Sequence, residues 1–73
     1  MKTEGDNQMD SYGYIETMGL LTAIEAADAA LKAANVVFTN CYIVKGGIVT
    51  VELAGDVAAV TAAVEAGSES ARK

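Results

Sequence analysis

The residues best suited to catalysis lie within one short stretch of this sequence. Glu25 and Asp28 are carboxylates three positions apart, and Lys32 follows Asp28 by four positions. On a helix these side chains share one face, where Asp28 and Lys32 can form an exposed ion pair. General acid–base catalysis needs a carboxyl group with a shifted pKa in a cleft, and the chain has no histidine. The pattern therefore predicts a solvated helix face, not an enzyme.

A single cysteine and a pair of adjacent glycines also have common structural explanations. Cys41 is the only cysteine, which excludes an intrachain disulfide. One cysteine without histidine also excludes the usual zinc ligand sets, so we expect a free thiol, buried or half-buried, and no metal or cofactor. Gly46 and Gly47 lack the surrounding pattern of a phosphate-binding loop. With Lys45 they are typical of a hairpin turn.

The length and composition favour one small domain that associates with copies of itself. A chain of 73 residues buries only about 60% of its unfolded surface, and such domains usually need disulfides, metals or partners. Because a disulfide and the usual zinc sites are excluded, self-association is the remaining source of stability. A hydrophobic fraction of 52% supports it. The net charge of −5, without clustered Lys or Arg, argues against nucleic-acid binding. No stretch is apolar enough for a membrane span and the N-terminus is unlike a signal peptide, so we expect a cytosolic location.

The first half of the sequence predicts a polar tail, a strand and a helix. Residues 1–11 are polar and acidic, which is typical of a flexible tail. β-prone residues predict a strand over Tyr12–Thr17. Helical spacing predicts a helix over Leu20–Ala34, with Thr22 and Glu25 at capping-box spacing. Its expected apolar face comprises Leu20, Leu21, Ile24, Ala27, Ala30 or Leu31, and Ala34. Its alanine-rich faces are typical of close helix packing (Ala26, Ala29, Ala30 and Ala33).

The second half predicts a β-hairpin followed by another helix. β-rich runs cover Val36–Val44 and Ile48–Ala54, and Lys45–Gly47 forms the turn between them. Asp56 is placed to cap a helix that begins at Val57. Gly67 either ends or weakens that helix. The expected apolar face comprises Val57, Val60, Ala63 and Val64.

The order strand, helix, strand, strand, helix predicts an α+β fold formed by residues 12–73. It contains five of the six elements of a ferredoxin-like unit, and the final strand is missing. In that topology the final strand pairs beside the first, so its absence leaves an open sheet edge. The residues alone are therefore compatible with a small regulatory or binding module, dimeric or trimeric, that uses this edge for a partner.

Three segments of the chain together resemble one known family. Gly19–Val36 (GLLTAIEAADAALKAANV) is similar to that family's first helix, and Tyr14–Gly19 is similar to its opening strand. Gly46–Gly67 (GGIVTVELAGDVAAVTAAVEAG) resembles its second hairpin strand, Gly-Asp turn and second helix. The segments cover most of residues 13–71 in the family's order and spacing. The family is that of the hexamer-forming BMC-domain shell proteins of bacterial microcompartments.

The resemblance implies a structural shell protein in a cytoplasmic bacterial compartment. Family members form flat cyclic homohexamers that tile with other shell proteins around enclosed enzymes. The hexamer pore passes small polar metabolites, and its loop maps to Lys45, Gly46 and Gly47. Six copies of Lys45 would favour anions. The family's lysine at the contact between tiles maps to Lys32, beside Asp28.

The sequence departs from the family pattern in two places. The family continues into a fourth strand and a short helix, which usually supply the basic partner of the edge lysine. Three explanations are open: the sequence is a fragment of a longer product, another chain supplies the strand, or the open edge has a function. Without the basic partner, the role of Lys32 in the contact between tiles also stays open. The loop reads Val-Lys-Gly-Gly instead of the commoner Lys-Ile-Gly-Ser-Gly, so pore selectivity does not carry over. Some relatives bind an iron–sulfur cluster through a pore cysteine, but Cys41 precedes the turn and is not expected to do so.

Overall fold

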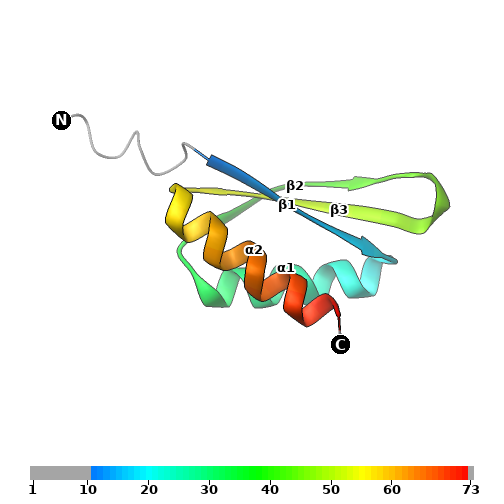
Figure 1. Cartoon of the computed structure of the whole chain (residues 1–73). Coiled ribbons are helices and arrows are strands. Elements are labelled where there is room, and N and C mark those ends of the chain that lie inside the picture. Colours follow the sequence, from blue (N-terminus) through cyan, green and yellow to red (C-terminus); the bar gives the residue numbers. More distant parts are fainter. Residues whose placement is uncertain (1–10, 73) are drawn as a thin grey trace.

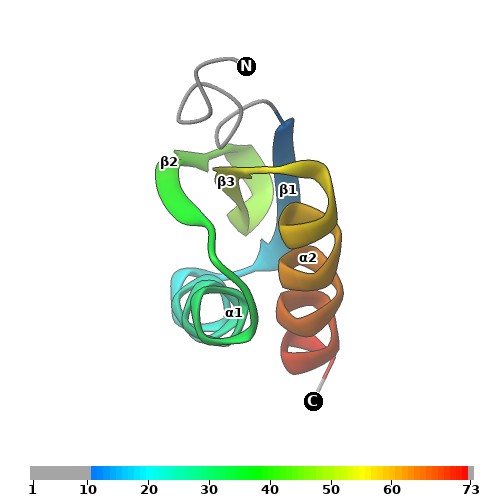
Figure 2. The same cartoon turned by 90° about the vertical axis from the view of Figure 1, so that its left-hand side faces the viewer.

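The computed structural model describes residues 11–72, which form three antiparallel strands with two helices on one face of the sheet (Figure 1). Along the chain the elements are β1 (Ser11–Met18), α1 (Leu20–Ala33), β2 (Val37–Ile43), the 3-10 turn η2 (Lys45–Gly47), β3 (Ile48–Gly55) and α2 (Val57–Ala71). Figure 2 shows the two helices side by side against the sheet. The predicted α+β order of strand, helix, strand, strand, helix is confirmed.

The central strand of the sheet is β3, which pairs antiparallel with β1 on one side and with β2 on the other. The register places Tyr14 of β1 and Asn40 of β2 opposite Glu52 of β3. The register of β2 shifts between Phe38 and Asn40, at Thr39. Within the described residues the outer side of β1 has no partner strand, as the predicted topology requires.

The core lies between the sheet and the helices. Side chains on a strand alternate between its two faces, so every second residue points toward the helices. Ile15 of β1 and Val51 and Leu53 of β3 are buried there. Small side chains cover them from the helices, namely Ala23, Ala26 and Ala30 of α1 and Ala63 of α2. The interpretation of the alanines as close packing is confirmed for Ala26 and Ala30, whereas Ala33, in the last turn of α1, is exposed.

Gly67 lies inside α2, at a place where this helix packs closely against α1. The sequence left open whether Gly67 ends or weakens the helix, and α2 in fact continues to Ala71. A Cβ atom at Gly67 would collide with the side chain of Ile15 and would lie 2.8 Å from the carbonyl oxygen of Ala26. Glycine is therefore needed here for close approach, not to terminate the helix.

The two helices begin in different ways. The Asp56 carboxylate accepts a hydrogen bond from the amide of Ala59 at 2.9 Å, which confirms Asp56 as the N-cap of α2. The first helix begins directly after Gly19, and no side chain caps it. Thr22 and Glu25 have capping-box spacing, but they do not cap this helix. The chain leaves β1 through a sharp turn at Gly19, which starts the helix before Thr22.

The other ends of the predicted elements differ from the structure by one residue. Ala34 is extended, so α1 ends at Ala33 instead of Ala34. The strand predicted over Tyr12–Thr17 is longer by one residue at each end, and Ser11 belongs to it rather than to the predicted tail. The remaining tail residues, 1–10, lie outside the described residues. Strand β2 is shorter than predicted by one residue at each end, and β3 gains Gly55.

The apolar face predicted for α1 is wrong in its larger members. Leu20, Leu21, Ile24 and Leu31 are 52%, 69%, 56% and 41% exposed. Alanines occupy the buried side because α1 packs tightly against α2 and the sheet, which leaves little room for larger side chains. Likewise, Val57 of α2 is exposed, whereas Val60 and Ala63 are buried as predicted.

Candidate functional site

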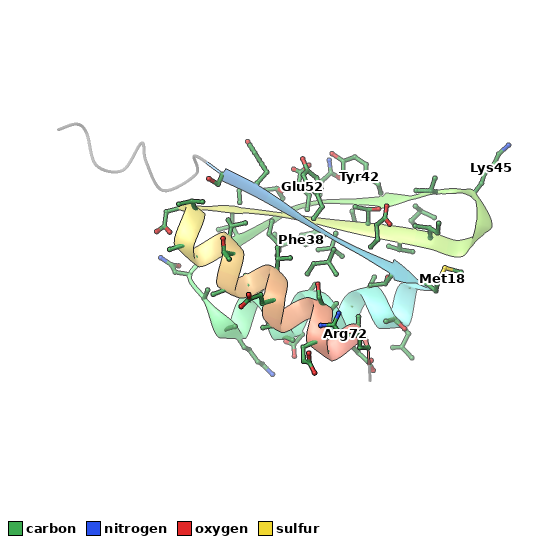
Figure 3. All side chains as sticks on the ribbon, viewed as in Figure 1. Met18, Phe38, Tyr42, Lys45, Glu52 and Arg72 are labelled. Carbon is green, nitrogen blue, oxygen red and sulfur yellow. The ribbon has the colours of Figure 1, made fainter. Side chains whose placement is uncertain are left out.

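The loop between β2 and β3 is a tight turn with a glycine pair. The amide of Val44 donates a hydrogen bond to the carbonyl of Ile48 at 2.8 Å and closes the turn. Gly46 and Gly47 have φ angles of 85° and 84°, which side chains other than glycine rarely adopt. Figure 3 shows Lys45 at the tip of this hairpin, pointing away from the sheet. The predicted hairpin turn is confirmed, and its one cation is solvent-exposed.

A second loop holds this turn in place. The amide of Gly19, between β1 and α1, donates a hydrogen bond to the carbonyl of Gly47 at 2.8 Å. The hydroxyl of Thr17 lies within hydrogen-bonding distance of the carbonyls of Gly19 and Val49, at 3.2 and 3.3 Å. The β2–β3 loop is therefore fixed to the start of α1 through main-chain groups, which no side-chain pattern in the sequence indicates.

The predicted edge residues lie on the last turns of α1. Lys32 Nζ is 3.0 Å from Asp28 Oδ2, and both side chains are largely exposed. The predicted ion pair between them is confirmed. Between Leu20, next to the glycine loop, and Lys32 the helix rises about 18 Å at 1.5 Å per residue. The structure therefore does not bring Lys32 near Lys45, and the two lysines lie at separate places on the molecule.

An apolar groove separates α1 from the outer strand β2. Its volume is about 390 Å³, and its lining includes Leu20, Ile24 and Leu31 of α1 with Phe38 and Cys41 of β2. It exists because β2 lies at the edge of the sheet, where neither helix covers it fully. Cys41 is a half-buried free thiol in this groove. The sequence does not indicate this groove, because the spacing of the apolar residues in α1 is that of a core-facing stripe.

A hydrogen-bonded cluster occupies the sheet face opposite the helices. The Glu52 carboxylate accepts hydrogen bonds from the Thr39 hydroxyl at 2.7 Å and from the Tyr42 hydroxyl at 3.0 Å. The amide group of Asn40 donates to the Tyr42 oxygen at 3.1 Å. Tyr14 lies beside Glu52 on β1. Figure 3 shows Glu52 and Tyr42 pointing away from the helices.

The cluster shifts the acidities of its members. The hydrogen bond from Thr39 lowers the pKa of Glu52, because it stabilises the carboxylate form. The pKa of Tyr42 is raised, chiefly by its hydrogen bond to Glu52. The pKa of Tyr14 is also raised, first by reduced hydration and then by Glu52. Sequence reasoning missed this cluster because its residues come from three strands and share no local motif.

The described residues show neither a cluster of metal-binding side chains nor a membrane-spanning helix. Within residues 11–72, no group of three or more His, Cys, Asp or Glu side chains is arranged to hold a metal ion. No helix in that part of the chain has both the length and the apolar character needed to cross a membrane.

Comparison with known proteins gives a consistent result. The family model described as the BMC domain matches residues 11–73. The bacterial microcompartment shell protein PduA of Citrobacter freundii is 49% identical over 65 residues, which are 89% of this chain and 70% of that protein. The shell protein EutM of Salmonella typhimurium is 45% identical over 89% of this chain and 68% of its own length. The carboxysome shell protein CsoS1A of Hydrogenovibrio crunogenus is 51% identical over 84% of this chain and 64% of its own length.

The fold also matches a solved structure. A microcompartment protein from Desulfitobacterium hafniense superimposes with a TM-score of 0.77 at 43% sequence identity. The match covers 82% of this chain and 33% of that one, so this chain spans about a third of the longer protein.

Proposed function

Because the chain belongs to the BMC-domain family of microcompartment shell proteins, we propose that it forms cyclic homohexameric tiles of a shell, each with a central pore. Members of this family are structural components and not enzymes. The shells that they build lie in the bacterial cytoplasm. Other shell proteins are the expected partners of such a tile, and enclosed enzymes are possible further partners.

The exposed apolar surface is the observation that carries this proposal. Within residues 11–72, thirteen large hydrophobic side chains are exposed, whereas Leu53 and Val51 are the largest that are fully buried. Fully burying one large apolar side chain contributes about 1.5–3 kcal/mol. The groove between α1 and β2 gathers several of the exposed side chains on one flank. Ring closure against a neighbouring copy would cover such a flank.

The β2–β3 loop is the proposed pore lining. Its two glycines leave most of the turn without side chains, and its anchorage to Gly19 fixes its position. Six symmetric copies would place a ring of Lys45 side chains near the axis, which favours anionic metabolites. Lys32 and Asp28, at the far end of α1, are proposed to lie at the outer edge between tiles.

The mass of the full chain in solution tests ring formation. Light scattering after size-exclusion chromatography should give about six times the 7.5 kDa chain mass. A stable monomer or dimer would contradict the proposal. It would favour a small ferredoxin-like module that uses the open edge of β1 for binding.

A pair of variants on α1 tests whether the groove is the contact. Ile24→Ser removes an exposed side chain that lines the groove and should shift the mass toward smaller species. Leu21→Ser removes a comparably exposed side chain that does not line it. The groove is not the contact if Leu21→Ser dissociates the ring and Ile24→Ser leaves it intact.

A further inference from the structure

The sheet face opposite the helices is rich in aromatic rings and acids, and its strands, all within residues 11–72, contribute no base to it. Three exposed tyrosines lie on it, Tyr12 and Tyr14 from β1 and Tyr42 from β2. Glu16 of β1 and Glu52 of β3 add two carboxylates. None of the three strands contains a lysine or an arginine. Each tyrosine ring has an electron-rich face that attracts cations.

Glu52 is fixed in position without being neutralised. Both of its carboxylate oxygens accept hydrogen bonds, but the donors, Thr39 and Tyr42, are uncharged hydroxyls. Asp28 and Glu69 differ, because within residues 11–72 each is paired with a cation, Lys32 or Arg72. The two hydroxyls occupy about half of the acceptor positions of a carboxylate. Glu52 therefore presents an oriented negative charge with room for a further donor.

The dimensions of this face match a polypeptide better than a small ion. Its rings and carboxylates are spread over three strands, about 10 Å across at the usual strand spacing. One ammonium or guanidinium group would contact only part of this area. A chain segment could place one cation on Glu52 and cover the neighbouring tyrosines with its other side chains.

We propose that the face carrying Tyr14, Tyr42 and Glu52 binds a basic polypeptide segment of a partner protein, whose arginine or lysine pairs with Glu52 between the tyrosine rings. Arginine fits best, because a planar guanidinium can donate two hydrogen bonds to a carboxylate and also lie against a ring. The proposal concerns the face opposite the helices and does not depend on ring formation.

Peptide titration of the full chain tests the proposal. A short peptide of alternating arginine and serine serves as the probe, and the same peptide with citrulline for arginine is its uncharged control. Binding is followed by calorimetry and by the NMR signals of the three tyrosines. The arginine peptide should bind at least tenfold more tightly than the citrulline peptide and should shift the signals of Tyr14 and Tyr42.

Two charge-matched variants locate the binding site. Glu52→Gln keeps an acceptor and should weaken binding of the arginine peptide about tenfold, the usual range for a charge-assisted contact. Glu25→Gln, an exposed acid on α1, removes the same charge and should change binding less than twofold. Tyr14→Leu keeps an apolar side chain and should weaken binding severalfold, because the ring face is lost.

Three results would overturn the proposal. Equal weakening by Glu52→Gln and Glu25→Gln would show general attraction to an acidic protein. Binding of free arginine amide as tight as that of the peptide would show a small-cation site. A change in oligomeric mass caused by Glu52→Gln would show that this face contacts another copy of the chain.

Discussion

The amide of Gly19 donates a hydrogen bond to the carbonyl oxygen of Gly47 at 2.8 Å, which joins the start of α1 to the β2–β3 loop. Gly19 has φ 89° and ψ 154°, a combination that is nearly restricted to glycine. The position of the proposed pore loop therefore depends on a backbone conformation outside that loop.

Gly19→Ala should destabilise the protein and loosen the loop. A side chain at this φ and ψ costs about 1–3 kcal/mol, although no atom lies within 4 Å of a Cβ built there. Urea unfolding at fixed protein concentration measures the loss. Gly46→Asn is the control, because φ 85° and ψ 9° lie near the left-handed region that asparagine tolerates. Equal stability of Gly19→Ala and the parent chain would show that the turn relaxes without cost.

Gly67→Ala should lower the unfolding free energy even though alanine favours helices. Helix propensity would improve by about 1 kcal/mol. The added methyl would collide with Ile15 and lie 2.8 Å from the carbonyl oxygen of Ala26. Overpacking of this kind costs about 1–3 kcal/mol, so we expect a net loss. The melting temperature checks the sign, and Ala62→Gly, at an exposed position of α2, controls for propensity alone.

The titrations of Glu52 and Tyr42 should be linked. Thr39 lowers the pKa of Glu52, so its contribution to stability is present above the unfolded pKa and is lost as the pH falls through the folded pKa. The raised pKa of Tyr42 acts in the opposite direction: its contribution is present below the unfolded pKa and is lost as the pH rises through the folded pKa.

Glu52→Gln should therefore lower the pKa of Tyr42, because it removes the carboxylate that accepts the hydrogen bond of the Tyr42 hydroxyl and that opposes the tyrosinate charge. Absorbance of the tyrosinate during a pH titration measures this change. The same variant should flatten the acid side of the stability profile. A Tyr42 pKa unchanged by Glu52→Gln would contradict the hydrogen bond between these side chains.

Lys32→Ala should affect assembly more than folding. Lys32 and Asp28 form an exposed pair, and such pairs contribute at most about 1 kcal/mol. If Lys32 lies between tiles, the variant should keep the mass of a single ring but fail to form extended sheets in electron micrographs. Glu65→Ala, an exposed charge on α2, is the control. Normal sheets from Lys32→Ala would remove this residue from the proposed edge.

Lys45→Glu should change ion selectivity without changing ring mass. The side chain lies at the hairpin tip and is exposed, so its replacement disturbs no described contact. Reversing the charge of a ring replaces an attractive field for anions by a repulsive one. Conductance of the ring in a planar bilayer under a salt gradient should move from anion-selective toward cation-selective. Identical selectivity would show that Lys45 does not line the pore.

The local features of this fold were predictable from the sequence. The Asp56 cap, the glycine turn at Gly46 and the ion pair of Asp28 with Lys32 each depend on residues at most four positions apart. Such contacts follow from helix and turn geometry and need no knowledge of what packs nearby. The same holds for the order of strands and helices, which gave the fold class.

The tertiary structure decided which apolar side chains are buried and which polar ones meet. Leu20 and Ile24 have the spacing of a core-facing stripe, yet Ala23 and Ala26 take the buried positions because the helices approach too closely for larger groups. Thr39 and Tyr42 meet Glu52 across paired strands, 13 and 10 positions away in the chain. The spacing of apolar residues shows that one face of a helix is apolar. The distance between that helix and the elements packed against it decides how large its buried side chains can be. That distance is set by the assembled layers, so it could not be read from the chain alone.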